Sequence, residues 1–320
     1  MKFLAINVVW GTEYSRFFVD VSLPATLFNG NLEHLAKNNK LTYRLYSTEQ
    51  DFDVIRKSPA FSHLLDLAVV EWIPLNNLKT DKYENILRCH NDALKCYSGG
   101  ENFIVFLSPN IVLSKDAMIF VEKKSEEGKR AIITPGLHIS KDVVMKILGE
   151  STALSVNPRE MVSLAISYPH LCQRLNSWDG NKISDWPVEL FWPVGNHGLL
   201  LHTFYLHPIM VQPREHIEAL KLGIDIDLVP RVCHENDIEI VTDSDSLCIY
   251  EAVSNKKWPL RFCPKMKPIW GIHYWMKQHT ISDYNKYCFR SAAKFHTLPL
   301  TSEWDKVEKD SLAVVDKILK

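Results

Sequence analysis

The stretch that decides the fold of this chain is Asn102-Phe-Ile-Val-Phe-Leu-Ser-Pro-Asn-Ile-Val-Leu-Ser114. Five consecutive apolar residues, Phe103 to Leu107, run directly into Ser-Pro-Asn. A short apolar run that is rich in β-branched and aromatic residues and ends at a proline predicts a buried central strand. The polar turn that follows, Ser108 to Asn110, lies where open α/β sheets place their ligand sites. The segment therefore predicts both a sheet and the edge of that sheet where a site should lie.

The rest of the first half alternates between strand and helix patterns. We expect strands over 3–10, 41–46, 68–73 and 130–134, and helices over 13–23, 51–58, 82–96 and 116–124. The helix over 82–96 has its apolar residues at helical spacing, which indicates one buried face. This alternation predicts an α/β fold with a Rossmann-like, mostly parallel sheet flanked by helices.

The second half has a less regular pattern and ends in a helical extension. We expect helices over 142–148, 158–167 and 302–319, and strands over 199–205 and 238–242. No internal repeat and no low-complexity linker interrupts the chain. We therefore predict a main nucleotide-binding and catalytic domain over 1–215 and a C-terminal extension over 216–320.

Composition and charge restrict the class of protein. The 320 residues are 46 % hydrophobic and 23 % charged, as in ordinary globular proteins, and the formal net charge is −1. Such a balance gives no global field that would attract nucleic acid, so we expect no nucleic-acid partner. Seven cysteines without a CxxC pair, and an apolar start too short for a secretory signal, favour a reduced, cytoplasmic protein. No run is long enough to span a bilayer, although peripheral contact with the inner face of the membrane stays open.

Several common catalytic signatures are absent from the sequence. It has no GxGxxG after a strand, no GxxxxGK[ST], no GxSxG and no HExxH. These absences count against dehydrogenases, P-loop enzymes, α/β-hydrolases and zinc proteases.

Two turns after the first strands offer groups that could bind a nucleotide. Trp10, Gly11 and Thr12 follow the first expected strand, and the glycine lets the backbone turn closely there. Thr48 and Asp51 follow the second strand, where they could hydrogen-bond a base or a ribose, or cap the next helix. From these residues alone, an ordinary strand-to-helix turn is the favoured interpretation of the first group.

The helix over 82–96 brings positive charge toward the same end of the sheet. Arg88 is a candidate partner for a diphosphate, because a cation offsets the charge that grows on a leaving phosphate. The alternative is a solvated helix face, which we favour for Lys95.

Several segments resemble bacterial glycosyltransferases of the GT-A fold. The start of that group is similar to Trp10-Gly-Thr-Glu-Tyr14, Leu23-Pro24 and Gly30-Asn31-Leu32, and its donor-site half is similar to Phe-Leu-Ser-Pro-Asn110, Ser114 and Gly128-Lys-Arg-Ala131. The resemblance implies an enzyme that moves a sugar from a nucleotide-sugar donor to a glycan or lipid-linked acceptor, in bacterial surface polysaccharide synthesis. It also implies donor binding at the carboxyl ends of the strands, by Trp10–Thr12, Thr48, Asp51, Arg88, Ser108 and Asn110.

Asn110 departs from the pattern of the metal-dependent members of this group. These carry an acidic side chain in that turn, which holds Mg²⁺ or Mn²⁺ against the diphosphate. Asn110 is neutral and can offer only a carbonyl oxygen to a metal, or a hydrogen bond to a hydroxyl. The sequence leaves Mg or Mn dependence open, and it also leaves open a catalytically inactive sugar- or nucleotide-binding protein on the same fold.

The second half supplies the candidates for the acceptor side and for a catalytic base. Trp192 could stack on a sugar ring, and His202 is the preferred histidine beside it. Glu189 and Asp225 are the predicted bases, because a carboxylate can take the proton of an acceptor hydroxyl. Asp225 and Asp227 would share a face if the segment were extended, and could then bind a metal together with His202. With His207, these residues also define an alternative, a His/Asp metal hydrolase.

Overall fold

The computed structural model describes residues 1–27, 30–148, 156–180, 182–254, 262–264, 268–279 and 281–320. They form two compact units. Unit 1 comprises Met1–Thr134, Met145–Val156 and His207–Glu239, and unit 2 comprises Pro135–Val144, Asn157–Leu206 and Ile240–Lys320. The functional boundary expected between residues 215 and 216 stays a prediction.

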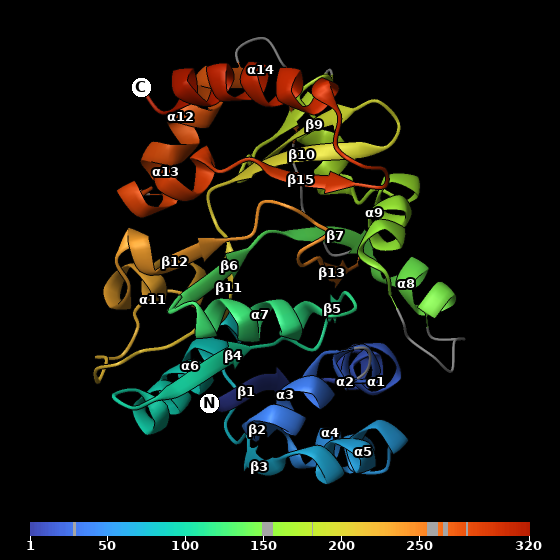
Figure 1. Ribbon diagram of the computed structural model, residues 1–320, viewed down its shortest axis with the longest axis vertical. Coiled ribbons are helices and arrows are strands. Elements are labelled where there is room, and N and C mark those ends of the chain that lie inside the picture. The colour runs from blue at the N-terminus through green and yellow to red at the C-terminus, as the bar shows by residue number, and fades with distance from the viewer. Residues whose placement is uncertain (28–29, 149–155, 181, 255–261, 265–267, 280) are drawn as a thin grey trace. The chain divides into compact units, whose positions relative to one another are not determined.

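A seven-stranded, mostly parallel sheet forms the centre of unit 1 (Figure 1). Its order is β12 (Ile238–Ile240), β6 (Ala131–Thr134), β11 (His207–Val211), β4 (Asn102–Phe106), β1 (Lys2–Val9), β2 (Lys40–Ser47) and β3 (Val69–Pro74). The strands β4, β1, β2 and β3 run parallel, whereas β11 is antiparallel to both of its neighbours. The predicted α/β class with a mostly parallel sheet is confirmed.

The central position of β4 follows from its apolar residues. Phe103 to Phe106 are all buried, and the strand is paired on both sides, with β1 and with β11. Burying one such side chain contributes about 1.5–3 kcal/mol, so a run of four strongly favours a place inside the sheet. Between β1 and β4 the register pairs Ile6 with Phe106, which brings the carboxyl ends of the two strands to the same edge.

Helices cover the sheet of unit 1, and several pack directly on a strand. They are α1 (Thr12–Phe17), η1 (Phe18–Ser22), α2 (Leu23–Leu27), α3 (Leu32–Asn38), α4 (Glu49–Ile55), α5 (Pro59–Leu67), α6 (Lys82–Tyr97), α7 (Ala117–Glu126), α11 (Ile224–Val232) and the 3-10 turn η2 (Glu235–Asp237). Helix α3 packs on β2, α5 on β3, α6 on β1 and α11 on β11. A short strand, β5 (Ile111–Leu113), follows the turn after β4.

One helix prediction is wrong at its end. We expected the first helix to stop before Pro24, but the chain stays helical to Leu27. A π-helical turn, η1, precedes the proline, and the amide of Leu23 bonds the carbonyl oxygen of Phe18, five residues back. Proline removes a backbone donor, and a wider turn before it lets the neighbouring carbonyl groups find other partners.

Unit 2 contains smaller sheets and the C-terminal helices. Strands β9 (Glu189–Val194), β10 (Gly198–Thr203) and β15 (Ala293–His296) form an antiparallel sheet, β7 (Gly136–Ser140) pairs in parallel with β13 (Ile249–Val253), and β8 (Lys182–Ser184) pairs with β14 (Phe262–Pro264). The helices α9 (Pro158–Ser167), α10 (Leu171–Leu175), α12 (Pro268–Gln278), α13 (Asp283–Arg290) and α14 (Ser302–Ile318) belong to this unit, and α8 covers Lys141–Leu148. Helix α14 packs on β9 (Figure 1). The predicted C-terminal helical extension is confirmed.

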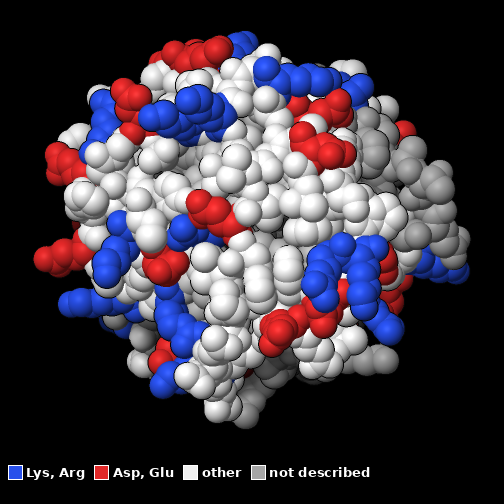
Figure 2. Space-filling model, turned by 90° about the horizontal axis from the view of Figure 1, so that it is seen from below, with Lys and Arg blue, Asp and Glu red and all other residues white. Residues whose placement is uncertain are grey.

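Two observations concern membrane-spanning helices and the distribution of surface charge. Among the residues that the structure describes, no helix combines the length and the apolar character needed to cross a bilayer. On the face drawn in Figure 2, basic and acidic side chains lie in small interspersed groups separated by uncharged surface. This distribution agrees with the formal net charge of −1.

Candidate active site at the carboxyl edge of the sheet

The strand order of unit 1 reverses between β1 and β4. The chain passes from β1 outward to β2 and β3 and then returns to place β4 on the other side of β1. Loops that leave neighbouring strands in opposite directions open a crevice at the carboxyl edge, and open α/β sheets bind ligands there. The turns 10–12 and 107–110 both leave the sheet at this edge, because β1 and β4 run parallel, and β1 continues to Val9, three residues beyond the pair Ile6–Phe106. The two turns predicted from the sequence therefore lie at the same edge of the sheet.

Asp51 ties the turn after β2 to the turn after β1. Its Oδ2 accepts the backbone N–H of Gly11 at 2.8 Å and the hydroxyl of Thr48 at 2.7 Å, and its Oδ1 accepts the hydroxyl of Ser15 at 2.9 Å. Thr48 in turn caps α4 by accepting the N–H of Asp51. Because both carboxylate oxygens are engaged inside the protein, Asp51 shapes the turn that would meet a ligand.

Gly11 supplies the backbone conformation that this turn requires. Its φ is +87°, in the left-handed region that side chains rarely adopt, and the residue is the N-cap of α1. The flanking Trp10 is half-buried and Thr12 is exposed, so both can be reached at the end of β1.

The turn after β4 is held by a hydrogen bond between two predicted donor-site residues. Ser108 Oγ donates to Asn110 Oδ1 over 2.9 Å, and both residues are half-buried. The side-chain oxygen that Asn110 could offer to a metal therefore already accepts one hydrogen bond and carries no charge.

A histidine–carboxylate pair stands at the end of β4. His207 opens β11 and its Nε2 lies 2.8 Å from the carbonyl oxygen of Phe106, the last residue of β4. Its other nitrogen, Nδ1, lies 3.6 Å from Asp225 Oδ1 on α11. His90 of α6 is buried beside Phe106, and burial, together with the charge of His207, lowers the pKa of His90 to about 3. His90 is therefore neutral. Asp225 is half-exposed, so solvent can reach its side chain.

Asp225 and Asp227 do not share a face, which corrects the expectation of an extended segment. Both lie in the first turn of α11, where acidic residues are favoured by the helix dipole, and two positions on a helix differ by about 200°. Asp227 bonds Arg231 at 2.7 Å and accepts the N–H of Lys221 at 2.9 Å. Asp227 thus stabilises the start of its own helix, and only Asp225 remains near His207.

Arg88 lies toward the rim of the sheet. Its Nη2 donates to the carbonyl oxygen of Asn76, in the loop after β3, at 3.2 Å. Three strand spacings separate β3 from β4, about 14 Å. Arg88 is therefore closer to the end of β3 than to the Ser108–Asn110 turn.

The predicted acceptor residues Trp192 and His202 lie in the core of unit 2. Trp192 is 7 % exposed, stacks on Trp178 and meets the ring of His202 edge-on. His202 is fully buried, with Nδ1 2.9 Å from the carbonyl oxygen of Phe289 and Nε2 3.0 Å from Ser311 Oγ. Burial lowers the pKa of His202 to about 4. Both side chains thus have the surroundings of core residues.

Unit 2 also carries an exposed aromatic pair that was not predicted from the sequence. Trp270 and Tyr274 stack on each other along α12 and are 67 % and 57 % exposed. In the sequence, the only sign of this pair is that the two aromatic residues are four positions apart, about one helical turn. A buried pair has the same spacing, so the sequence does not show that these side chains are exposed.

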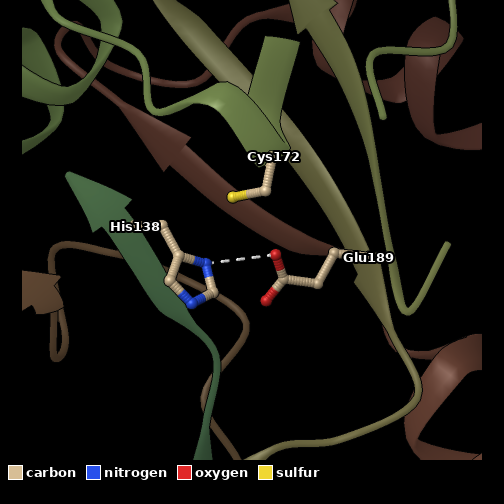
Figure 3. A group of neighbouring side chains, drawn as sticks. All are labelled: His138, Cys172 and Glu189. Carbon is tan, nitrogen blue, oxygen red and sulfur yellow. Dashed lines mark ion pairs between the residues drawn. The ribbon is translucent and has the colours of Figure 1, made fainter. Parts of the chain in front are cut away.

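Glu189, the other predicted base, is part of a buried cluster in unit 2. Figure 3 shows its carboxylate beside the imidazole of His138 and the thiol of Cys172, which the sequence analysis had not connected with it. Burial acts to lower the pKa of His138, but interactions with Cys172 and Glu189 outweigh it and raise that pKa well above its usual value. The cluster therefore has a field that favours positive charge.

The four residues of the alternative metal hydrolase do not meet as one group in the described part of the chain, although His207 lies 3.6 Å from Asp225. Over the described part of the chain, two groups of three or more ligand-type side chains come within ligand distance, namely His138 with Cys172 and Glu189, and Asp243 with Asp245 and His296. Neither group contains His202, Asp225 or Asp227. His202 is enclosed in a core, and Asp227 bonds Arg231. The metal role considered for these three residues is thus not supported by their placement.

Comparisons with known proteins give distant structural likenesses only. No known protein family matches the chain, and no curated protein matches it. Mouse xyloside xylosyltransferase 1, in its apo form, is 11 % identical over 49 % of this chain and 63 % of its own, with a TM-score of 0.32. The 4-diphosphocytidyl-2C-methyl-D-erythritol synthase of Anaerococcus prevotii is 13 % identical over 42 % and 55 %, with a TM-score of 0.29. The chain thus spans less than two thirds of each neighbour, and at such low scores we base no assignment on them.

Proposed function

We propose that this protein is a glycosyltransferase that binds a nucleotide-sugar at the carboxyl edge of β1 and β4 in unit 1. The observation that carries the proposal is the reversal of strand order between these two strands, with a polar turn at the end of each. This is the place in an open α/β sheet where a nucleotide fits without displacing the core.

In this scheme, the turn after β1 receives the nucleotide. Trp10 and Thr12 supply the contact surface, and Asp51 keeps Gly11 and Thr48 in place through the three hydrogen bonds that it accepts in and around the two turns. A turn that is already ordered loses little conformational entropy when a ligand binds.

The diphosphate would lie over Ser108 and Asn110. The residues of this turn do not fit a divalent metal, because Asn110 is neutral and its oxygen accepts from Ser108. Stabilisation of the leaving phosphate then falls to donors and cations of the protein, and Arg88 would have to leave Asn76 to contribute.

Asp225 is the better placed of the two predicted bases. It lies in unit 1 beside His207, which contacts the end of β4. A carboxylate in this position can accept the proton of an acceptor hydroxyl as the new glycosidic bond forms. His207 would act as a positioning residue, since it stands between Asp225 and the strand. The acceptor in this proposal is a glycan or a lipid-linked glycan of bacterial surface polysaccharide, used at the inner face of the membrane.

The test is a binding and turnover screen on the purified chain. Thermal shifts with UDP, GDP, CMP and their sugars identify the donor, and release of the nucleotide, with and without Mn²⁺, measures turnover. We expect Asn110→Ala and Arg88→Ala to weaken donor binding, while Lys95→Ala on the same helix leaves it unchanged. If both variants bind the donor like the parent protein, the placement of the donor site is wrong.

Asn110 also favours a second candidate, a sugar- or nucleotide-binding protein without catalysis. The neutral turn lacks a metal-holding carboxylate, whereas the strand order that would position a nucleotide is unchanged. Tight binding of a nucleotide-sugar without turnover, in the presence of a range of glycan acceptors, would favour this candidate over the transferase.

A further inference from the structure

Three side chains of types that bind transition metals meet inside unit 2. They are His138 on β7, Cys172 on α10 and Glu189 at the start of β9, and their ligand atoms all lie within 4.8 Å of one another. Cys172 is 3 % and Glu189 8 % exposed. Figure 3 shows the imidazole, the thiol and the carboxylate pointing toward a common space. Three separate elements of one compact unit therefore supply the cluster.

The distance between His138 and Glu189 suits two ligands of a tetrahedral ion. His138 Nδ1 and Glu189 Oε2 are 3.3 Å apart. Around a tetrahedral zinc ion with metal–ligand bonds of about 2.0–2.2 Å, a nitrogen and an oxygen are separated by about 3.3–3.5 Å. Thiolate, imidazole and carboxylate are also the three ligand types that zinc accepts, whereas Mg²⁺ and Ca²⁺ prefer oxygen alone.

Neighbouring side chains hold two of the three ligands, His138 and Cys172, in place. Glu251 Oε2 lies 3.5 Å from Nε2 of His138, the ring nitrogen that faces away from Glu189. A carboxylate on the far nitrogen is the usual support of a metal-bound histidine, because it fixes the tautomer and the ring. His170 accepts the N–H of Cys172 at 3.3 Å and its Nδ1 lies 3.0 Å from the sulfur, which positions the thiol at the start of α10.

The other group of ligand-type side chains is a weaker candidate for a metal site. It consists of Asp243, Asp245 and His296. Arg159 bonds both carboxylate oxygens of Asp245, with its closest contact at 2.7 Å, and His296 lies 2.9 Å from Asp243. A guanidinium and an imidazole thus already serve these carboxylates. In the His138 cluster, the described contacts include no Lys or Arg at Glu189.

We propose that His138 Nδ1, Cys172 Sγ and Glu189 Oε2 bind a zinc ion, with a fourth position left to water. The ion ties the segment Pro135–Val144 to the segment Asn157–Leu206 within unit 2. This site is independent of the donor crevice in unit 1.

The experiment measures metal in the full chain, purified without chelators and then dialysed against zinc-free buffer. We expect stoichiometric zinc by elemental analysis. After replacement by Co²⁺, we expect a near-ultraviolet band of thiolate-to-cobalt charge transfer, which requires a cysteine ligand. This readout uses the parent protein, so it does not depend on a variant that folds.

Variants then assign the ligands. Cys172→Ser should lose the cobalt band and the zinc, whereas Cys288→Ser, which alters another buried cysteine of unit 2, should keep both. Glu251→Gln should keep the metal but weaken zinc affinity by about 10–100-fold, as loss of an outer-shell partner does. Absence of zinc even after loading, a cobalt spectrum without the thiolate band, or rapid alkylation of Cys172 in zinc-loaded protein would each overturn the proposal. Donor binding in unit 1 is measured separately, so either proposal can fail alone.

Discussion

Asp51 accepts the backbone N–H of Gly11 at 2.8 Å, across two neighbouring strands that are far apart in sequence. One carboxylate thus fixes the positive-φ turn after β1 and the cap of the helix after β2. The stability of the candidate site and its geometry depend on the same side chain, which makes Asp51 a sensitive position.

Asp51→Ala should lower the free energy of unfolding by about 2–3 kcal/mol. It leaves an amide and two hydroxyl groups without their charged acceptor, and such hydrogen bonds contribute about 1.5–3 kcal/mol. Urea denaturation measures the change. Asp53→Ala is the matched control, because Asp53 is half-exposed and forms an exposed ion pair with Arg56, so its loss should change stability by at most about 0.5 kcal/mol. Equal effects of the two variants would contradict the role assigned to Asp51.

Asp225→Asn should abolish transfer without abolishing donor binding. If Asp225 takes the proton of the acceptor, the amide cannot replace it, and kcat should fall by about 10²–10⁴-fold. Single-turnover assays on the acceptor, with donor affinity measured separately, distinguish the two steps. Glu235→Gln, which alters an exposed carboxylate of the same unit, is the control. Retention of full activity in Asp225→Asn would exclude this base.

Trp192→Ala should destabilise the protein far more than Trp270→Ala. Trp192 is packed in the core of unit 2 and its truncation leaves a cavity, which costs about 3–5 kcal/mol. Trp270 is 67 % exposed, and its loss should stay within about 0.5 kcal/mol. Thermal and urea unfolding monitor both variants. A sugar-binding defect in a stably folded Trp192→Ala protein would instead restore the acceptor role predicted from the sequence.

The pair His296–Asp243 should stabilise unit 2 in mildly acidic solution. The hydrogen bond that His296 donates to Asp243 raises the pKa of His296 above 6.5, and the same bond lowers the pKa of Asp243 below 3.8. The histidine contribution is complete below its unfolded pKa and is lost as the pH rises through the higher folded value. The aspartate contribution is present above pH 3.8 and is lost as the pH falls.

His296→Gln should therefore lower Tm more at pH 5.5 than at pH 8.5. The comparison is made by thermal unfolding in buffers of constant ionic strength. An equal loss at both pH values would show that the charge of His296 contributes nothing and that only its packing matters.

Much of unit 1 was predictable because its signals are local. The apolar run from Phe103 to Leu107 predicted a buried strand, and the alternation around it predicted parallel pairing; the structure confirms both. Asp225 and Asp227 show the limit of local reading. Their spacing suits a strand as well as a helix start, and only the packing of α11 on β11 selects the helix.

Local patterns in the sequence identify the buried strands and the polar turns that follow them, because burial leaves a periodic or continuous apolar pattern. Which of these turns and side chains meet depends on tertiary packing. Strand order places His207 at the end of β4 beside Asp225, and the folding of unit 2 brings His138, Cys172 and Glu189 together. Such contacts join residues far apart in the chain, and no local preference of the backbone records them.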